Sequence, residues 1–91
     1  MIYGRVIGQI HGTIQHPFYN SRRLLVVEKL SNDGKTTGDY LIAVDSVGAG
    51  ADEQVIVLDE GNGARQVLAS EDGPVRSVVV GIVDDIILSN E

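Results

Sequence analysis

A segment of small and β-branched residues, at positions 43–50, constrains this chain more than any other part of it. Its first residues favour an extended, packed backbone, and Asp45 ends the apolar run. Gly48 and Gly50 then permit backbone angles that are closed to other residues. A strand that stops at so bare a loop brings its backbone close to a phosphate, to another chain or to a symmetry axis. On the loop alone, a simple tight turn between two strands explains it equally well.

The core must be built from aliphatic side chains. The chain has 91 residues, of which 43% are hydrophobic, with one Phe, three Tyr and no Trp. This length and composition predict a single globular domain over residues 1–91, near the size at which one core is only modestly stabilising. Without cysteine there is no disulfide, and the sequence predicts no structural zinc site. Association between copies of the chain is the remaining source of stability.

The charge balance argues against polyanionic partners. Asp and Glu outnumber Lys and Arg by 13 to 7, which gives a formal net charge of −6. Nucleic-acid affinity rests mainly on Lys and Arg that neutralise phosphates, so we expect no nucleic-acid partner. The segment 1–10 is too short for a signal peptide, and no apolar run approaches the roughly 20 residues of a membrane span. We therefore expect a soluble, cytoplasmic protein with no membrane partner.

Short apolar segments alternate with glycine and acidic residues along the chain. We predict five strands, over residues 2–10, 23–30, 40–45, 54–58 and 77–83, with 86–88 behind the last. The turn signal at 31–34 predicts a hairpin between the second and third strands. Asn62 is a possible N-cap for a helix of about two turns over residues 64–69. This order predicts a mainly β fold, a small five-stranded OB-like barrel with one short helix.

The first strand carries glycine where a curved or closely packed sheet would need it. The segment alternates in part, which predicts that five of its residues share one face: Ile2, Gly4, Val6, Gly8 and Ile10.

No catalytic or metal-binding constellation stands out. His11 and His16 lie five residues apart in a loop, which is a weak ligand pattern, and we expect them to face solvent or an interface. Asp84 and Asp85 are adjacent, so on a strand they point to opposite faces; we expect them, like the acids at 71–72, to face water or a partner. No serine lies in a nucleophile elbow. We expect no enzyme activity, no metal and no cofactor.

The Gly-Asn-Gly sequence at 61–63 opens the predicted helix and has two possible uses. A helix N-terminus can bind an anion, but no Lys-Ser/Thr pair follows, and Asp59 and Glu60 would repel phosphate. Helix capping is therefore the favoured use.

An OB-like barrel also invites a second function, the binding of single-stranded nucleic acid or a small ligand. That use needs stacked aromatics and a basic groove, whereas Tyr3 and Tyr40 are isolated and Arg22-Arg23 is the only basic pair.

Three motifs occur in order: Ala-Val-Asp-Ser-Val-Gly-Ala-Gly at 43–50, Gly-Ala-Arg at 63–65 and Gly-Ile-Val-Asp at 81–84. Taken together they resemble the pentameric vertex proteins of bacterial microcompartment shells, the family shared by carboxysomes and by ethanolamine- and propanediol-type metabolosomes. Gly-Arg-Val-Ile-Gly at 4–8 and Leu-Leu-Val-Val at 24–27 look like the first two strands of that family. The resemblance runs nearly from end to end.

The resemblance implies a homopentamer that carries out no chemistry and caps the fivefold vertices of a shell tiled by hexameric shell proteins. It places the protein in the shell of a microcompartment within the cytoplasm. A head-to-tail ring uses two different patches on each subunit, and small side chains let neighbouring backbones approach. The residues expected at a subunit interface or axial opening are Asp45, Gly48, Ala49, Gly50, Asn62, Gly63, Arg65 and Asp84.

Within this set, we expect Arg65 to pair with Asp45 or Asp84, within or across subunits, because the planar guanidinium holds a carboxylate bidentately. The loop 48–50 is expected at the seam between neighbours rather than at the axis. The chain departs from the family where Gly-Asn-Gly at 61–63 replaces a small serine-rich turn and where Arg76 replaces an acid. It also ends at Glu91, earlier than many relatives. These departures bear on an edge contact and on a tail contact with a neighbouring subunit.

Overall fold

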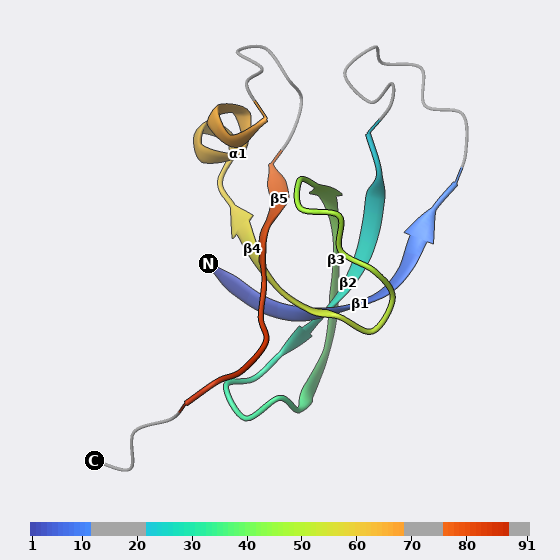
Figure 1. Ribbon diagram of the computed structural model, residues 1–91, viewed down its shortest axis with the longest axis vertical. Coiled ribbons are helices and arrows are strands. Elements are labelled where there is room, and N and C mark those ends of the chain that lie inside the picture. Colours follow the sequence, from blue (N-terminus) through green and yellow to red (C-terminus); the bar gives the residue numbers. More distant parts are fainter. Residues whose placement is uncertain (12–21, 69–75, 88–91) are drawn as a thin grey trace.

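Five strands close into a barrel, and one short helix covers one end of it (Figure 1). The computed structural model describes residues 1–11, 22–68 and 76–87, apart from the side chains at 62 and 65. The elements are β1 (Ile2–Ile10), β2 (Leu24–Leu30), β3 (Thr36–Asp45), β4 (Gln54–Asp59), α1 (Gly61–Val67) and β5 (Ser77–Ile82). Around the barrel the strands follow the order β1-β2-β3-β5-β4. The predicted five-stranded barrel with one helix is confirmed.

The hairpin between β2 and β3 is also confirmed. The Gly34 amide donates to the Ser31 carbonyl at 2.9 Å, and Gly34 adopts φ +84°, which its missing side chain allows. The Asp33 carboxylate accepts from the Ser31 hydroxyl and from the Lys35 amide. β3 begins at Thr36, four residues earlier than predicted, because the Thr37 hydroxyl bonds to the Lys29 carbonyl and polar residues continue the pairing.

The alternation predicted for β1 holds only to its middle. Val6 pairs with buried Val27, but the register shifts before Gly8, which pairs with half-buried Val26. An extra residue in a strand turns the following side chains to the other face. Gly8 and Ile10 therefore leave the face of Val6, and the prediction that all five residues share one face is wrong. Gly4 does meet the predicted need for close packing, since a Cβ there would clash with Val27 Cγ1 and with the Glu28 carbonyl oxygen.

Small aliphatic side chains fill the barrel. Members of the main cluster are almost fully excluded from solvent: Val6, Leu25, Val27, Ala43, Ala49, Val55, Val57 and Val79. In a second cluster, Ala64 of α1 packs with Val44 of β3 and Val78 of β5. Ala49 belongs to the loop between β3 and β4, so this loop contributes to the core as well as to the surface.

The helix differs from the prediction at its start. α1 begins at Gly61, and its N-cap is Glu60, which has an extended backbone and makes no side-chain capping hydrogen bond. Asn62 lies inside the first turn, so its predicted role as N-cap is wrong. Gly63 packs closely against β4, since a Cβ there would lie 2.7 Å from Leu58 Cδ2. A glycine here lets α1 follow β4 directly and rest on the end of the barrel.

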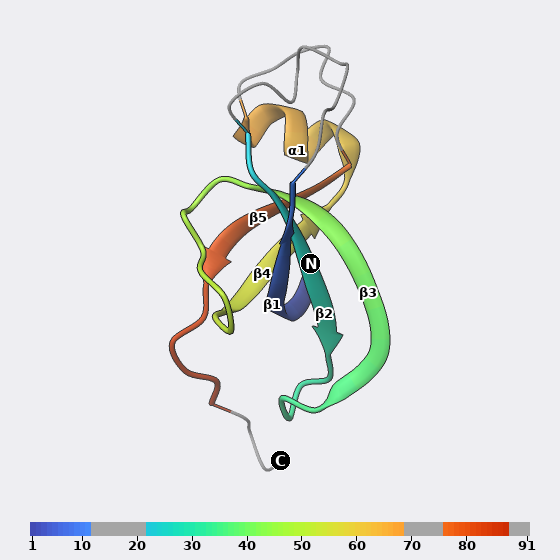
Figure 2. The same ribbon diagram turned by 90° about the vertical axis from the view of Figure 1, so that its right-hand side faces the viewer.

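The chain leaves the barrel after β5. This strand ends at Ile82, one residue before the predicted end, and residues 83–87 continue without regular secondary structure. The Val83 amide still donates to the Gln54 carbonyl at 2.8 Å, which is the last backbone bond to β4. From there the segment runs away from α1 toward the far end of the molecule (Figures 1 and 2).

Candidate subunit interface

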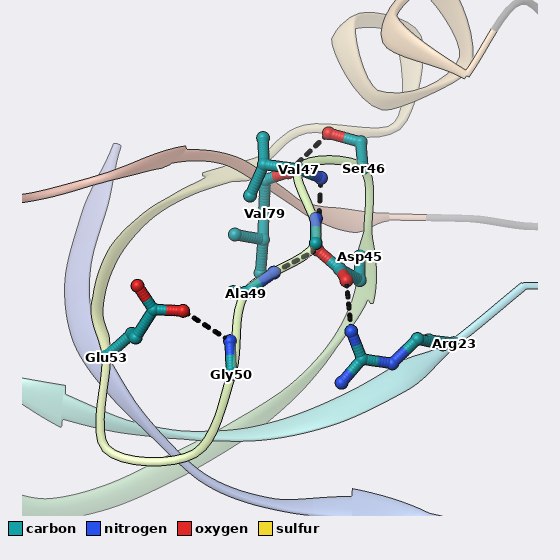
Figure 3. A network of polar contacts seen from close by, with 9 residues as sticks. Arg23, Asp45, Ser46, Val47, Ala49, Gly50, Glu53 and Val79 are labelled. Atoms are coloured by element: carbon teal, nitrogen blue, oxygen red, sulfur yellow. Dashed lines mark hydrogen bonds and ion pairs between the residues drawn. The ribbon is translucent and has the colours of Figure 1, made fainter.

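Asp45 organises the loop between β3 and β4 (Figure 3). Its Oδ1 atom accepts hydrogen bonds from the amides of Val47, Gly48 and Ala49, at 3.0, 3.1 and 3.3 Å. Its Oδ2 atom is 2.9 Å from Arg23 Nη1, and the two side chains form an ion pair. Arg23 is the residue just before β2. The Asp45 side chain is only 4% exposed. A carboxylate is needed here because it can accept many bonds at once, and those bonds fix the turn.

Further bonds hold the loop against β5 and β1. The Ser46 hydroxyl donates to the Val79 carbonyl of β5. At the other end of the loop, the Asp52 amide donates to the Val6 carbonyl, and the Val6 amide donates to the Glu53 carbonyl. Glu53 Oε1 also accepts from the Gly50 amide at 2.6 Å (Figure 3). These hydrogen bonds fix the backbone of the loop against the barrel.

The three small residues of this loop have different roles. Gly48 is exposed and adopts φ +75°, a conformation that L side chains rarely adopt. Ala49 is 0% exposed and packs into its own subunit's core, so its side chain is not available to a neighbour. A Cβ on Gly50 would lie 3.2 Å from the Glu53 carboxylate. Gly48 and the adjacent Val47, which is 37% exposed, face outward, as do Ser46, Ala51 and Asp52.

The other predicted interface residues lie elsewhere. Gly63 is on α1 at one end of the molecule, whereas Asp84 is exposed on the segment after β5, which runs toward the opposite end (Figure 1). The side chains of Asn62 and Arg65 fall outside the described part of the structure, so the expected Arg65 pairing stays a prediction. Of its two expected partners, Asp45 already binds Arg23 and three amides within the subunit. The predicted residues thus form no single cluster.

Ion pairs that the sequence did not reveal tie neighbouring strands together. Arg5 on β1 pairs with Glu28 on β2 at 2.9 Å. Asp59 at the end of β4 accepts from the Ser77 hydroxyl at 2.6 Å and from Arg76 Nε at 3.1 Å. The Ser77 hydrogen bond is the main cause that lowers the pKa of Asp59, with the Arg76 guanidinium acting in the same direction. Arg76, which replaces the family's acid, therefore has a partner in its own subunit.

The outer surfaces that expose apolar side chains include β3 and the segment after β5. On β3, Tyr40 is 58% and Ile42 is 55% exposed. On the other side, the segment after β5 carries Ile86 at 39% and Ile87 at 91%. We call these the β3 face (Tyr40, Ile42) and the tail segment (residues 83–87). Sequence reasoning missed the β3 face and predicted only Asp84 of the tail segment, since exposure depends on which strands lie beside a side chain.

The alternative function, nucleic-acid or ligand binding, finds no support in the described residues. An open depression of about 350 Å³ lies between the hairpin turn and the tail segment, and Asp33, Asp84 and Asp85 are among its lining residues. Carboxylates repel a phosphate backbone. Tyr3 is the one aromatic residue of its lining, and its hydroxyl donates to Gln54.

Within residues 1–11, 22–68 and 76–87, no three His, Asp or Glu side chains gather as a possible metal site. The same residues contain no helix long and apolar enough to cross a membrane. His11 is exposed, as expected, whereas the expectations for His16 and for Glu71 and Asp72 fall outside the described residues.

Comparisons with known proteins agree over nearly the whole chain. A family model described as "Ethanolamine utilisation protein EutN/carboxysome" matches residues 1–84. The bacterial microcompartment shell vertex protein EutN of Salmonella typhimurium is 40% identical over 82 residues, which cover 90% of this chain and 82% of the relative. The solved structure of Gloeobacter violaceus CcmL matches with a TM-score of 0.90 at 37% identity, over 99% of this chain and 92% of that one. GrpN, a pentameric microcompartment shell protein from Rhodospirillum rubrum, matches with a TM-score of 0.86 at 37% identity, over 98% and 100%.

Proposed function

The chain belongs to the EutN/carboxysome family of microcompartment shell vertex proteins, and we propose that it closes a fivefold vertex of such a shell as a ring of five identical subunits. The observation that carries this proposal is the match to a pentameric shell protein over 98% of this chain and the whole of the other. The protein acts through its shape and its contacts, and it has a structural role in the shell.

Ring formation suits the surface of the subunit. A cyclic ring joins unlike patches head to tail, so each subunit must carry two different contact surfaces. The β3 face and the tail segment are two such surfaces, and both expose apolar side chains in the single subunit. The fixed loop at 45–53 supplies a third element of the seam, through the exposed backbone of Gly48 and the side chain of Val47.

The partners of the ring are hexameric shell proteins of the same shell. Hexagonal tiles fill a plane without gaps, and a flat sheet of them has no closed form. Replacing a sixfold tile by a fivefold one removes a wedge of the sheet and forces curvature at that point. A ring of five at each vertex therefore converts a flat sheet into a closed shell.

The ring is non-catalytic. Hydroxyl–carboxylate contacts such as Ser31 with Asp33 and Ser77 with Asp59 hold a hairpin turn and a strand end, and the Asp45 carboxylate is occupied by amides of its loop. These groups fix turns and strand ends, and they leave no activated group for chemistry.

Co-expression with a hexameric shell protein tests the proposal. Hexamers alone should form sheets or tubes with open ends, and adding this chain should give closed particles in negative-stain electron microscopy. The chain should be recovered in the purified particles as a minor component. If closed particles form equally well without it, or if they exclude it, the proposed vertex function is wrong.

A further inference from the structure

We propose that a depression at the end of the subunit opposite α1 binds an arginine side chain presented by a segment of a different, basic protein. This inference concerns a surface of the single subunit and goes beyond the proposed closure of a vertex. It makes no use of the contacts between subunits of the ring.

The depression lies between the β2–β3 hairpin and the tail segment, which reach the same end of the molecule (Figure 1). It consists of two adjoining hollows, of about 350 and 410 Å³, that share several lining residues. Tyr3 of β1 and Gln54 and Ile56 of β4 form its barrel side. The hairpin turn at 32–34 and the tail residues 83–86 form the other sides.

The apolar part of the lining suits the stem of a long side chain. Ile56, Val83 and Ile86 contribute aliphatic groups, and Tyr3 contributes an aromatic ring. The Tyr3 hydroxyl donates to Gln54 Oε1 at 2.5 Å, which holds this ring on the barrel. Ile86 is still 39% exposed, so part of this apolar surface is in contact with water. An occupant that covers it gains free energy from the burial.

The polar part of the lining is negative. Asp33, Asp84 and Asp85 are all exposed. Among the described residues, Asp84 and Asp85 have no ion-pair partner, whereas Asp33 lies 3.9 Å from Lys35. These carboxylates attract a cation and repel an acidic segment or a phosphate. A wholly apolar occupant would take water from them without supplying a counter-charge.

An arginine side chain matches both parts of the lining. Its methylene stem can lie on the aliphatic groups while its charged end stays at the rim. The guanidinium stacks on aromatic rings and offers several donors in a plane, which suits neighbouring carboxylates. A lysine ammonium is more compact and more strongly hydrated, so it fits this combination less well.

The arginine is best supplied by another protein. Arg5, Arg23 and Arg76 pair with carboxylates of their own subunit, and none of the three lines the depression. A second copy of the chain brings the same net charge of −6, which opposes its approach, whereas a basic protein is attracted. Exposed ion pairs are weak singly, so a free guanidine gains little, and a segment adds the contacts of its neighbouring residues.

Peptide binding to the assembled protein tests the inference. The probe is the peptide acetyl-Ala-Arg-Ala-amide, and the matched peptide carries citrulline, which has the shape of arginine without its charge. Amide NMR shifts of the isotope-labelled protein should change at residues 32–34 and 83–86. The arginine peptide should bind at least about tenfold more tightly than the citrulline peptide and than free methylguanidine.

A pair of charge-matched variants shows where the peptide binds. Asp84→Asn with Asp85→Asn should weaken binding of the arginine peptide about tenfold. Asp52→Asn with Glu60→Gln removes the same charge from exposed positions outside the depression and should leave binding unchanged. Native mass shows whether each variant still assembles. If the first variant does not, Asp85→Asn alone, with an expected loss of about threefold, replaces it in the comparison.

The outcomes separate this inference from the proposed function. Equal weakening in both double variants shows attraction by net charge alone and overturns the inference. Equal affinity of the citrulline peptide or of free methylguanidine also overturns it. An assembled protein that binds no peptide, as when a neighbouring copy fills the depression, has the same consequence. Each of these results leaves the vertex function standing, because that function depends on assembly and shell closure.

Discussion

Asp45 binds three amides through one oxygen and Arg23 through the other, at the point where β3 turns into its loop. Its position after an apolar run could be read from the sequence, and so could the need for glycine at position 48. Its partner could not, because Arg23 precedes β2 and is brought beside Asp45 only by the pairing of β2 with β3. Local turn chemistry is encoded within a few residues, whereas ion pairs between strands depend on register.

Removing the Asp45 carboxylate should destabilise the fold. We expect Asp45→Ala to lower the free energy of unfolding by about 2–4 kcal/mol, because it leaves turn amides and an arginine without their acceptor. Asp45→Asn, which keeps one acceptor oxygen, should cost less. Urea unfolding at a fixed protein concentration measures both. Equal stability of the alanine variant and the unmodified chain would contradict the role given to this carboxylate.

Two residues in the same loop adopt a left-handed backbone conformation, and we expect substitutions at them to change stability in opposite directions. Asp52 has φ +68° and Gly48 has φ +75°. We expect Asp52→Gly to stabilise the protein, and Gly48→Ala to destabilise it, each by about 1 kcal/mol, since side chains are strained in this region. Thermal unfolding of the two variants provides the comparison. Changes of the same sign in both would show that the loop backbone is not as described.

Among the elements, the apolar segments of the sequence predicted all five strands to within a few residues. The register shift in β1 and the start of α1 could not be predicted in this way. Strict alternation gives no sign of an extra residue, so Gly8 was placed on the wrong face. Asn62 looked like an N-cap, but the helix begins one residue before it and has Glu60 as its N-cap. The register of β1 depends on the neighbouring strand, which no local pattern encodes.

The contact between the end of β4 and the start of β5 should be sensitive to acid. The pKa of Asp59 in the folded protein is lowered below its ordinary value of 3.8, mainly by the Ser77 hydrogen bond and also by Arg76. Stabilisation from this group is therefore fully present above pH 3.8 and is lost as the pH falls through the folded pKa. Asp59→Asn should flatten the fall in melting temperature between about pH 5 and pH 2. An unchanged pH profile in this variant would contradict the prediction.

At the scale of the whole molecule, the family could be identified from three ordered motifs, but the seam could not be located. The predicted interface residues proved to lie at the loop, on α1 and after β5, which are separate parts of the subunit (Figure 1). The exposed apolar side chains of β3 and the tail segment lie outside the three motifs: Tyr40, Ile42, Ile86 and Ile87. Exposure of Tyr40 or Ile87 depends on which strands lie beside them, and this depends on the complete barrel.

The expected pairing of Arg65 also belongs to this scale. We predict that Arg65→Ala weakens the ring. If Arg65 pairs with an acid of a neighbouring subunit, such as Asp84, its removal leaves that acid without a counter-charge. Arg65→Lys is the matched control and should retain part of the effect. Native mass and melting temperature measured across a dilution series report the change. If both are identical to those of the unmodified chain, Arg65 has no role in assembly.

The central claim is that this chain assembles as a ring of five, and its mass in solution tests that claim most directly. Native mass spectrometry of the purified protein should give a single dominant species of five 9.7 kDa chains, at low micromolar concentration. That species should dissociate without a stable dimer or trimer in large amount. A dominant monomer, or an assembly of any number other than five, would contradict the account.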